Sequence, residues 1–155
     1  MSKLVLTIRE GVEQDVATIV EFGAAMAMET ESLKLDPVES REAAEGIVRD
    51  AARGRYYLAE VEGDVVGQLM VRQEWMPERN AFAWWIQSVY VKPKYRRRGY
   101  YRRLYEQVRH MATEQGVAAL RLYADRENAP ARAAYSRLGM KETGPVYECE
   151  VSSPR

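Results

Sequence analysis

Apolar and polar residues alternate through residues 4–10, LVLTIRE, and this pattern predicts a first strand. The apolar residues that follow recur at the spacing of one helix face, which predicts a helix from about Val12 to Met28. Asp36 stands directly before Pro37, and this pair is typical of the first residues of a helix. We therefore predict a second helix from Pro37 to about Ala52.

The middle of the chain has the pattern of strands joined by a tight turn. Two apolar runs, residues 55–61 and 65–75, lie on either side of the turn residues 62–64, Glu-Gly-Asp, which predicts a β-hairpin. The next run, residues 82–91, is long and apolar enough to be a central strand.

The last third of the chain changes from helix to strand again. A helix with one apolar face precedes Gly116, and residues 118–125 then have the pattern of a strand. A short helix is expected after Asn128, and residues 140–151 have the pattern of a final hairpin. This element order predicts an α/β fold, with a mixed, mostly antiparallel sheet flanked by helices, as a single domain over residues 1–155.

Composition excludes several classes of protein. Lys and Arg number 23 against 23 Asp and Glu, so no overall field attracts a polyanion, and we expect no nucleic acid partner. Cys149 and His110 are the only residues of their types, which excludes an internal disulfide and a Cys/His zinc site. We expect no metal, no membrane span, and a place in the reducing cytoplasm.

One local cluster of charge stands out in this neutral chain. Residues 95–108, YRRRGYYRRLYEQV, place five arginines around Gly99 directly after the predicted central strand. They could form a nucleic acid patch, a solvated helix face or a phosphate site built from the free N–H groups of a helix start. The absence of lysine from residue 95 to residue 140 argues against the nucleic acid interpretation.

Two segments together resemble the GNAT superfamily of N-acetyltransferases. The first matches the family's phosphate-binding loop, and the second matches a later motif that reaches the thioester. The loop motif falls on Arg96, Arg97, Arg98, Gly99, Tyr100 and Tyr101, and the later motif falls on Asn128, Ala131, Tyr135, Gly139 and Met140. The resemblance implies acetyl transfer from acetyl-CoA to a primary amine, by direct attack in a ternary complex. Tyr101 departs from the family pattern, which has Gly or Ala there, and we expect its ring to turn away from the loop.

The resemblance also implies roles for particular residues. The backbone N–H groups of Val89, Tyr90 and Val91 would bind the pantetheine arm and the thioester carbonyl of the cosubstrate. Tyr135 would be the general acid that protonates the leaving thiolate, and Asn128 would bond the cofactor arm. From the residues alone, Tyr135 could equally be a core aromatic and Asn128 only a helix cap.

The general base and the acceptor site are less specific. Candidate bases are Glu29, Glu31, Glu74 and Asp125, each of which could be an ordinary surface acid. The family's fold places the acceptor near residues 25–37 and 74–85, where we expect Met26, Glu31, Trp75 and Trp85 to contact it.

Acids and indoles together suit a small cationic amine, although a peptide amine remains open. The tryptophans could instead be buried in the core or in a homodimer interface. A second function also remains open, a non-catalytic GNAT-like module that binds acyl-CoA as a regulator.

Overall fold

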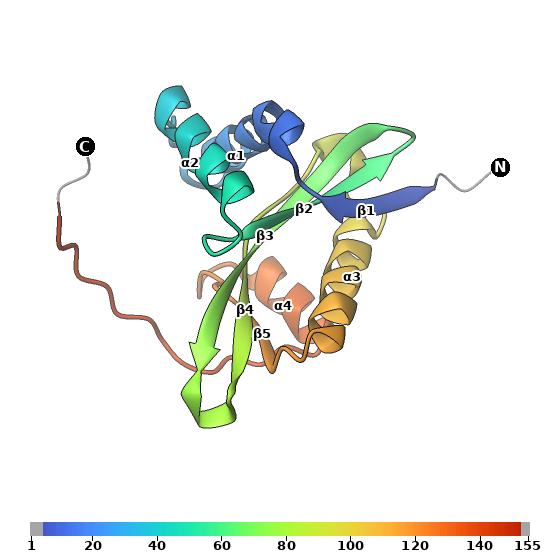
Figure 1. The fold of residues 1–155 in the computed structure, drawn as a ribbon. Helices are drawn as coiled ribbons and strands as arrows, with labels where there is room; N and C mark the ends of the chain where they lie inside the picture. Colours follow the sequence, from blue (N-terminus) through green and yellow to red (C-terminus); the bar gives the residue numbers. More distant parts are fainter. Residues whose placement is uncertain (1–4, 153–155) are drawn as a thin grey trace. The chain divides into compact units, whose positions relative to one another are not determined.

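The computed structural model describes residues 5–152 of the protein. They divide into two compact units, one ending at Tyr123 and the other beginning at Ala124, and each is described by itself. The first unit holds a five-stranded sheet in the order β1-β2-β3-β4-β5 (Figure 1). Its strands are β1 (Leu6–Glu10), β2 (Arg55–Val61), β3 (Asp64–Met76), β4 (Ala81–Val91) and β5 (Ala119–Leu122).

The sheet is mixed, as the sequence pattern predicts. Strands β1 to β4 pair antiparallel, and β4 pairs with β5 in parallel. The turn between β2 and β3 is also confirmed, because Glu62 and Gly63 have φ values of 51° and 81°, the left-handed conformation that a tight hairpin needs. Leu4, which the alternation places in the first strand, lies outside the described residues.

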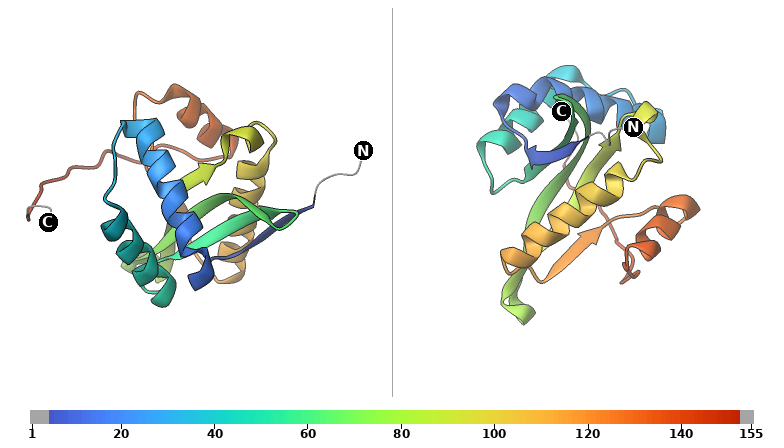
Figure 2. Two further views of the ribbon diagram at one scale, coloured as in Figure 1. Left: turned by 90° about the horizontal axis from the view of Figure 1, so that it is seen from above. Right: turned by 90° about the vertical axis from the view of Figure 1, so that its right-hand side faces the viewer.

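Helices cover both faces of this sheet (Figures 1 and 2). Val16 and Ile19 of α1 pack with Ala44 of α2 against one face, and Tyr100 of α3 packs against Ala59 on the other. The long helices are α1 (Val16–Glu31), α2 (Pro37–Arg49) and α3 (Tyr100–Glu114), and the short 3-10 helices are η1 (Glu13–Asp15), η2 (Pro77–Arg79) and η3 (Pro93–Tyr95).

The start of α2 confirms the predicted cap. Asp36 accepts hydrogen bonds from the N–H groups of Val38, at 2.8 Å, and Glu39, at 3.0 Å, and Pro37 is the first helical residue. The predicted first helix begins as the 3-10 turn η1, and α1 then extends to Glu31. Local sequence signals therefore locate the helices of this unit to within a few residues.

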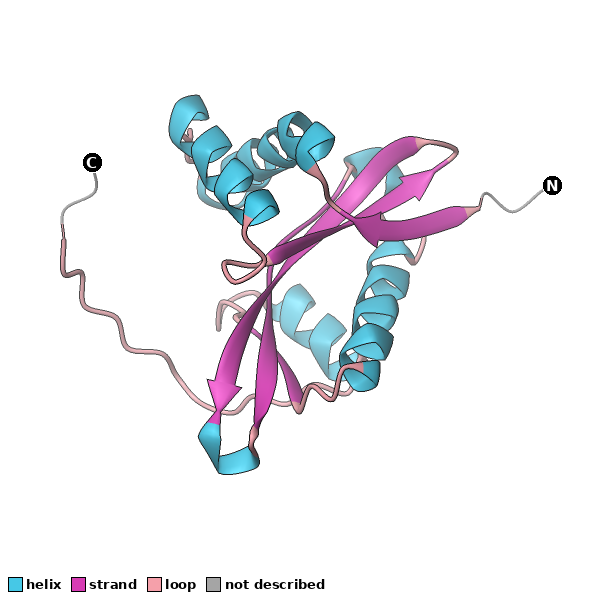
Figure 3. Ribbon diagram, in the orientation of Figure 1, coloured by secondary structure: helices cyan, strands magenta, loops and turns pink. Residues whose placement is uncertain are grey.

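The second unit contains the helix α4 (Ala129–Arg137), as predicted, with Asn128 as its N-cap residue. The predicted final hairpin is wrong, because residues 140–151 form neither a helix nor a strand (Figure 3). The alternation of apolar and polar residues in VYECEV, residues 146–151, indicates only which side chains would share a face if the segment were a strand. A strand also needs the hydrogen-bonding groups of a neighbouring edge, and the described sheet contains five strands.

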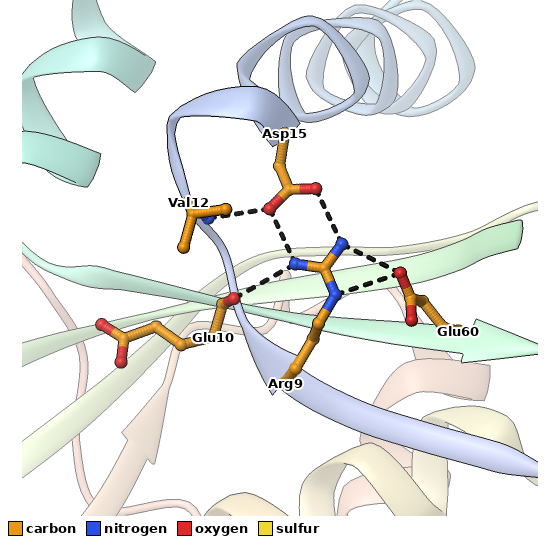
Figure 4. Close-up of polar contacts among 5 residues, drawn as sticks. All are labelled: Arg9, Glu10, Val12, Asp15 and Glu60. Atoms are coloured by element: carbon orange, nitrogen blue, oxygen red, sulfur yellow. Dashed lines mark hydrogen bonds and ion pairs between the residues drawn. The ribbon is translucent and has the colours of Figure 1, made fainter. Parts of the chain in front are cut away.

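A charged cluster ties the first strand to the start of the first helix (Figure 4). Arg9 of β1 donates two hydrogen bonds of 2.8 Å to the carboxylate of Asp15 and one of 3.0 Å to Glu60 of β2. Asp15 also accepts the N–H of Val12 at 2.8 Å. The hydrogen bonds from Arg9 hold the pKa of Asp15 below its usual range, although burial acts in the opposite direction.

Replacing Asp15 with asparagine is expected to lower the free energy of unfolding by about 1.5–3 kcal/mol at neutral pH, because a charged hydrogen bond inside the fold is lost. The native pKa of Asp15 lies below its unfolded value of about 3.9, so this contribution is complete above that pH. It is lost as the pH falls through the native pKa. Urea unfolding at pH 7 and pH 3 should show the difference between wild type and Asp15→Asn shrinking in acid.

Glu13→Gln is the matched control for this experiment. Glu13 accepts from Arg49 in an exposed ion pair next to the same helix start. Exposed pairs contribute little, so this variant should unfold almost as wild type does. An equal loss in both variants, or a difference that does not depend on pH, would contradict the role assigned to Asp15.

Candidate functional site

The segment between β4 and α3 leads directly into a helix start. Arg97 and Gly99 have φ values of 62° and 79°, and Gly99 is the N-cap residue of α3, with no side chain capping the helix. The N–H groups of the first helical turn therefore lack both an intrahelical partner and a side-chain cap, and they point outward together. Such a helix start binds phosphate oxygens.

The three consecutive arginines of this loop differ in what they contact. Arg96 donates to the backbone oxygen of Val91 at 2.8 Å and to Glu29 at 2.7 Å, and it stacks over the ring of Tyr90. Arg98 lies over the ring of Tyr95, with 5.9 Å to the ring centroid. The side chains of Arg97 and Arg98 are exposed beside the helix start, where they can add charged hydrogen bonds to an anion.

The two tyrosines at the start of α3 use their rings for packing. Tyr100 is buried in the cluster formed by Ala59, Val61 and Val66, so only its backbone can reach an anion at the helix start. Tyr101 is half-buried and its hydroxyl oxygen is fully buried, as expected for a ring that turns away from the loop. No side chain caps the start of α3, so the ring of Tyr101 does not occupy the capping position.

Strand β4 has a bulge before it reaches the loop. Its register with β3 shifts between Gln68↔Tyr90 and Met70↔Gln87, so β4 has one extra residue there. Ser88, inside the bulge, has a φ of 53°. Pairing with β5 ends at Ile86, and beyond it β4 has no strand partner on that side within residues 5–152. The predicted residues Val89, Tyr90 and Val91 occupy this one-sided stretch.

Tyr90 points from the bulged stretch toward α1. Its ring lies 5.0 Å from that of Phe22, centroid to centroid, and it is buried. Burial raises the pKa of Tyr90, the Glu29 carboxylate raises it further, and Arg96 opposes both effects. Tyr90 is therefore a neutral phenol at pH 7, and its ring is used for packing against Phe22.

Two of the candidate bases are engaged in ion pairs. Glu29, in the last turn of α1, pairs with Arg96, and Glu74 of β3 pairs with Arg121 of β5 at 2.7 Å. Glu31, the last residue of α1, is exposed and forms no ion pair within the described chain. Asp125, in the second unit, accepts the N–H of Glu127 at 2.8 Å in a turn.

The predicted acceptor residues do not form one cluster. Trp75 pairs edge-on with Phe82, with ring centroids 5.0 Å apart, and is half exposed. Trp85 stacks on Tyr123 at 4.6 Å and lies under Arg121. In the regular part of the β3–β4 pairing, Trp85 is opposite Arg72 and shares its face of the sheet. Trp75 is three residues after Arg72 on β3, so alternation places Trp75 on the other face.

The face that carries Trp85 is the one that α1 and α2 partly cover, because Met70 of this face packs against those helices. The predicted residue Met26 is half-buried on α1.

Asn128 and Tyr135 lie on α4 in the second unit. The side-chain oxygen of Asn128 accepts the N–H of Ala131 at 3.2 Å, so Asn128 does cap the helix. Tyr135 is half-buried, and its backbone oxygen accepts the N–H of Met140 at 3.0 Å. Gly139, with a φ of 85°, allows this tight end of the helix.

Sequence reasoning missed two residues of the bulge region, Ser88 and Gln68. Gln68 is fully buried on β3 and donates to the backbone oxygen of Ser88. The available signal was an amide side chain inside the apolar run VVGQLMV, residues 65–71, where a buried strand position calls for an apolar residue.

Residues 5–152 contain no group of three or more His, Cys, Asp or Glu side chains that could hold a metal ion. In the same part of the chain, no helix combines the length and apolar character needed to cross a membrane.

Comparison with known proteins matches this geometry to one family. The family model described as the acetyltransferase (GNAT) family matches residues 24–140, which is more than half of the chain. A solved structure of a possible acetyltransferase from Clostridium difficile 630 is 35% identical, with a TM-score of 0.90. The match covers 97% of this chain and all of that one.

More distant solved structures share the fold. One is a ribosomal-protein-alanine N-acetyltransferase from Brucella melitensis biovar Abortus 2308, with 20% identity and a TM-score of 0.78, covering 96% of this chain and 100% of that one. Another is a predicted acetyltransferase with acetyl-CoA from Clostridium acetobutylicum, with 14% identity and a TM-score of 0.76, covering 94% and 96%.

Proposed function

The chain belongs to the acetyltransferase (GNAT) family, and we propose that it transfers the acetyl group of acetyl-CoA to a primary amine in a ternary complex. The single observation that best supports this proposal is the sequence of features along β4. A bulge at Ser88 in β4 is followed by the end of the strand at Val91 and then, after the turn η3, by an uncapped helix start at Gly99. In this proposal the bulged strand supplies backbone N–H groups for the thioester, and the following helix start supplies those for the diphosphate.

In this proposal the loop from Arg96 to Tyr101 binds the diphosphate of acetyl-CoA. The helix start supplies N–H donors, and the arginine side chains supply charge. Backbone N–H groups of Val89, Tyr90 and Val91 bind the pantetheine arm and polarise the thioester carbonyl. Asn128 adds a bond to the cofactor arm through its side-chain NH2 group, while its oxygen caps α4.

The chemistry needs two proton movements. The amine nitrogen attacks the thioester carbon, a C–N bond forms, and the C–S bond breaks with its electron pair on sulfur. Tyr135 gives its phenol proton to the departing thiolate, and the proton of the attacking nitrogen passes to Glu29 or Glu74, directly or through water. We place the acceptor, a small molecule or a peptide, near Met26, Glu31, Trp75 or Trp85.

An assay of thiol release tests the proposal directly. Acetyl-CoA is mixed with the protein and a panel of amines, including amino sugars, polyamines and peptides with free N-termini. Release of free CoA that depends on both protein and amine supports acetyl transfer. Tight binding of acetyl-CoA without turnover on any amine would instead favour the non-catalytic acyl-CoA module, which the pairing of Glu29 and Glu74 with arginines also favours.

Single glutamine replacements at Glu29, Glu31 and Glu74 test the acceptor side. A cationic acceptor steered by one of these acids should show a higher Michaelis constant in that variant, and the effect should fade with added salt, because exposed charges are screened beyond about 8 Å at physiological ionic strength. A base should instead show a lost acidic limb in the pH–rate profile.

Glu114→Gln, at an exposed acid that pairs with His110 at the end of α3, is the control for these variants. If all three variants match wild type in both tests, the cationic acceptor is excluded and Asp125 or a water chain becomes the leading proton route.

We further propose that the protein works in the reducing cytoplasm, in keeping with its single cysteine, Cys149. Sedimentation of the purified protein tests whether it forms a homodimer.

A further inference from the structure

Gln68 is an unusual residue for its position. Only 1% of its surface is exposed, and with Asp15 it makes up the buried polar side chains of the described residues. Its side-chain oxygen is buried and has no hydrogen-bond donor within residues 5–152. Leaving a polar atom unsatisfied in the core costs about 1–3 kcal/mol, so an apolar residue would serve stability better here.

The amide of Gln68 has one partner, the bulge in β4. Its nitrogen Nε2 lies 3.4 Å from the backbone oxygen of Ser88, and it donates to that oxygen. The orientation of the amide follows from this contact, because the flipped amide would face one oxygen with another. Ser88 itself has a φ of 53°, a conformation that residues other than glycine seldom adopt without support.

This contact also sets the direction of the next N–H group. In a trans peptide the C=O and the following N–H point in opposite directions. The oxygen of Ser88 points toward the side-chain amide of Gln68, so the N–H of Val89 points away from that amide. Val89 also lies in the stretch of β4 that has no strand partner on its β5 edge within residues 5–152, because the pairing with β5 ends at Ile86.

We propose that Gln68 is a positioning residue for acetyl transfer. It holds the Ser88–Val89 peptide so that the N–H of Val89 faces the thioester carbonyl and stabilises the oxyanion that forms when the amine attacks. The inference rests on the proposed function, since it assigns a supporting group to the backbone donors of β4. Gln68 acts through the backbone and does not touch the substrate itself.

The variant Gln68→Met tests this role, because methionine has a similar length and no donor. Loss of an oxyanion donor lowers kcat by about 10²–10³-fold, and loss of its support should lower kcat by part of that, about 10- to 100-fold. The dissociation constant of CoA, which has no acyl carbonyl, should stay within about twofold of wild type. Gln73→Met, at an exposed glutamine of the same strand, is the matched control and should leave kcat unchanged.

The infrared stretch of the thioester carbonyl supplies a readout that a purely structural role would not move. Acetyl-CoA labelled with ¹³C at the carbonyl should show a lower stretching frequency when bound to wild type than in water, because a hydrogen bond weakens the C=O bond. In Gln68→Met the frequency should return toward the value in water. This measurement needs no acceptor amine, so it can be made before the acceptor is identified.

Gln68→Glu is a second variant that keeps the test decisive if the methionine variant fails to fold. A neutral carboxyl can donate to the oxygen of Ser88, whereas a carboxylate repels it, and burial raises the pKa of such a carboxyl. The carbonyl shift should therefore be retained at low pH and lost at high pH.

The possible results separate the positioning role from the proposed function. If folded Gln68→Met, or Gln68→Glu at high pH, keeps the carbonyl shift of wild type, the positioning role is overturned, even where stability or kcat falls. If wild type neither binds acetyl-CoA nor shifts its carbonyl, the proposed function fails and the positioning role fails with it. A shift in wild type that Gln68→Met loses, and that Gln68→Glu loses only at high pH, with CoA affinity retained, supports both.

Discussion

Gly99→Val is expected to abolish the thermal stabilisation that CoA gives to the wild-type protein. Gly99 has a φ of 79°, which a β-branched residue adopts only with strain, and the backbone of the loop must approach the diphosphate closely. A Cβ added at Gly99 meets no atom within 4 Å in the free protein, so the substitution should leave the fold largely intact. The defect should appear in binding, because a valine side chain fills space that the phosphates need or turns the N–H groups aside.

The size of this effect can be stated in advance. CoA at a hundred times its dissociation constant stabilises the native state by about 2.7 kcal/mol, which for a chain of this length raises the melting temperature by roughly 5–10 °C. NAD and ATP should raise it less. In Gly99→Val the rise with CoA should vanish within the error of a thermal unfolding measurement.

Gly116→Val is the matched control for the loop glycine. Gly116 follows α3 at its opposite end, has a φ of 73°, and an added Cβ there also meets no atom within 4 Å. The two variants therefore carry a similar backbone strain, but only one of them alters the helix start. If Gly99→Val binds CoA as tightly as wild type, the assignment of the phosphate loop is wrong.

Tyr135→Phe is expected to slow turnover by roughly ten- to ten-thousandfold while CoA affinity is retained, the range for losing a positioned general acid. Phenylalanine keeps the half-buried aromatic ring at this position of α4. The hydrogen bond from the N–H of Met140 to the backbone oxygen of residue 135 does not involve the hydroxyl. The phenol proton is lost, so the thiolate must leave without a donor. Steady-state kinetics with a good acceptor, together with calorimetric titration of CoA, separate the two effects.

Tyr147→Phe provides the control in the same unit, because Tyr147 is 92% exposed. It should match wild type in both measurements. Unchanged turnover in Tyr135→Phe would move the acid role to another group. A parallel loss of CoA affinity and turnover would mark Tyr135 as a structural aromatic residue.

The local features of this protein could be predicted from its sequence. Asp36 and Pro37 locate the start of α2, Glu62 and Gly63 locate a hairpin turn, and the apolar periodicity locates α3. Each of these signals depends on the conformational preferences of a few adjacent residues, which remain similar in any fold. The helix start at Gly99 was predictable for the same reason. Its free N–H groups belong to the backbone of the first helical turn, so they do not depend on contacts with distant residues.

Only the tertiary structure decided which distant residues meet. Glu29 and Arg96 are 67 positions apart and Glu74 and Arg121 are 47 apart, yet each pair forms an ion pair. Their meeting depends on how α1 packs on the sheet and on the register of three strands, which no local pattern encodes. The candidate bases therefore looked like independent acids in the sequence.

The register between β3 and β4 determined the geometry of the bulge and the positions of the two tryptophans. One extra residue at Ser88 sets the direction of the backbone donors in β4, and unbroken alternation elsewhere separates Trp75 from Trp85 across the sheet. The sequence by itself determined the family, the order of helices and strands through α4, and the glycine at the helix start, because motifs and local periodicity carry that information. The bulge, its support by Gln68 and the absence of strands in residues 140–151 depend on hydrogen bonds between segments, which form only when the edges of the sheet are in place.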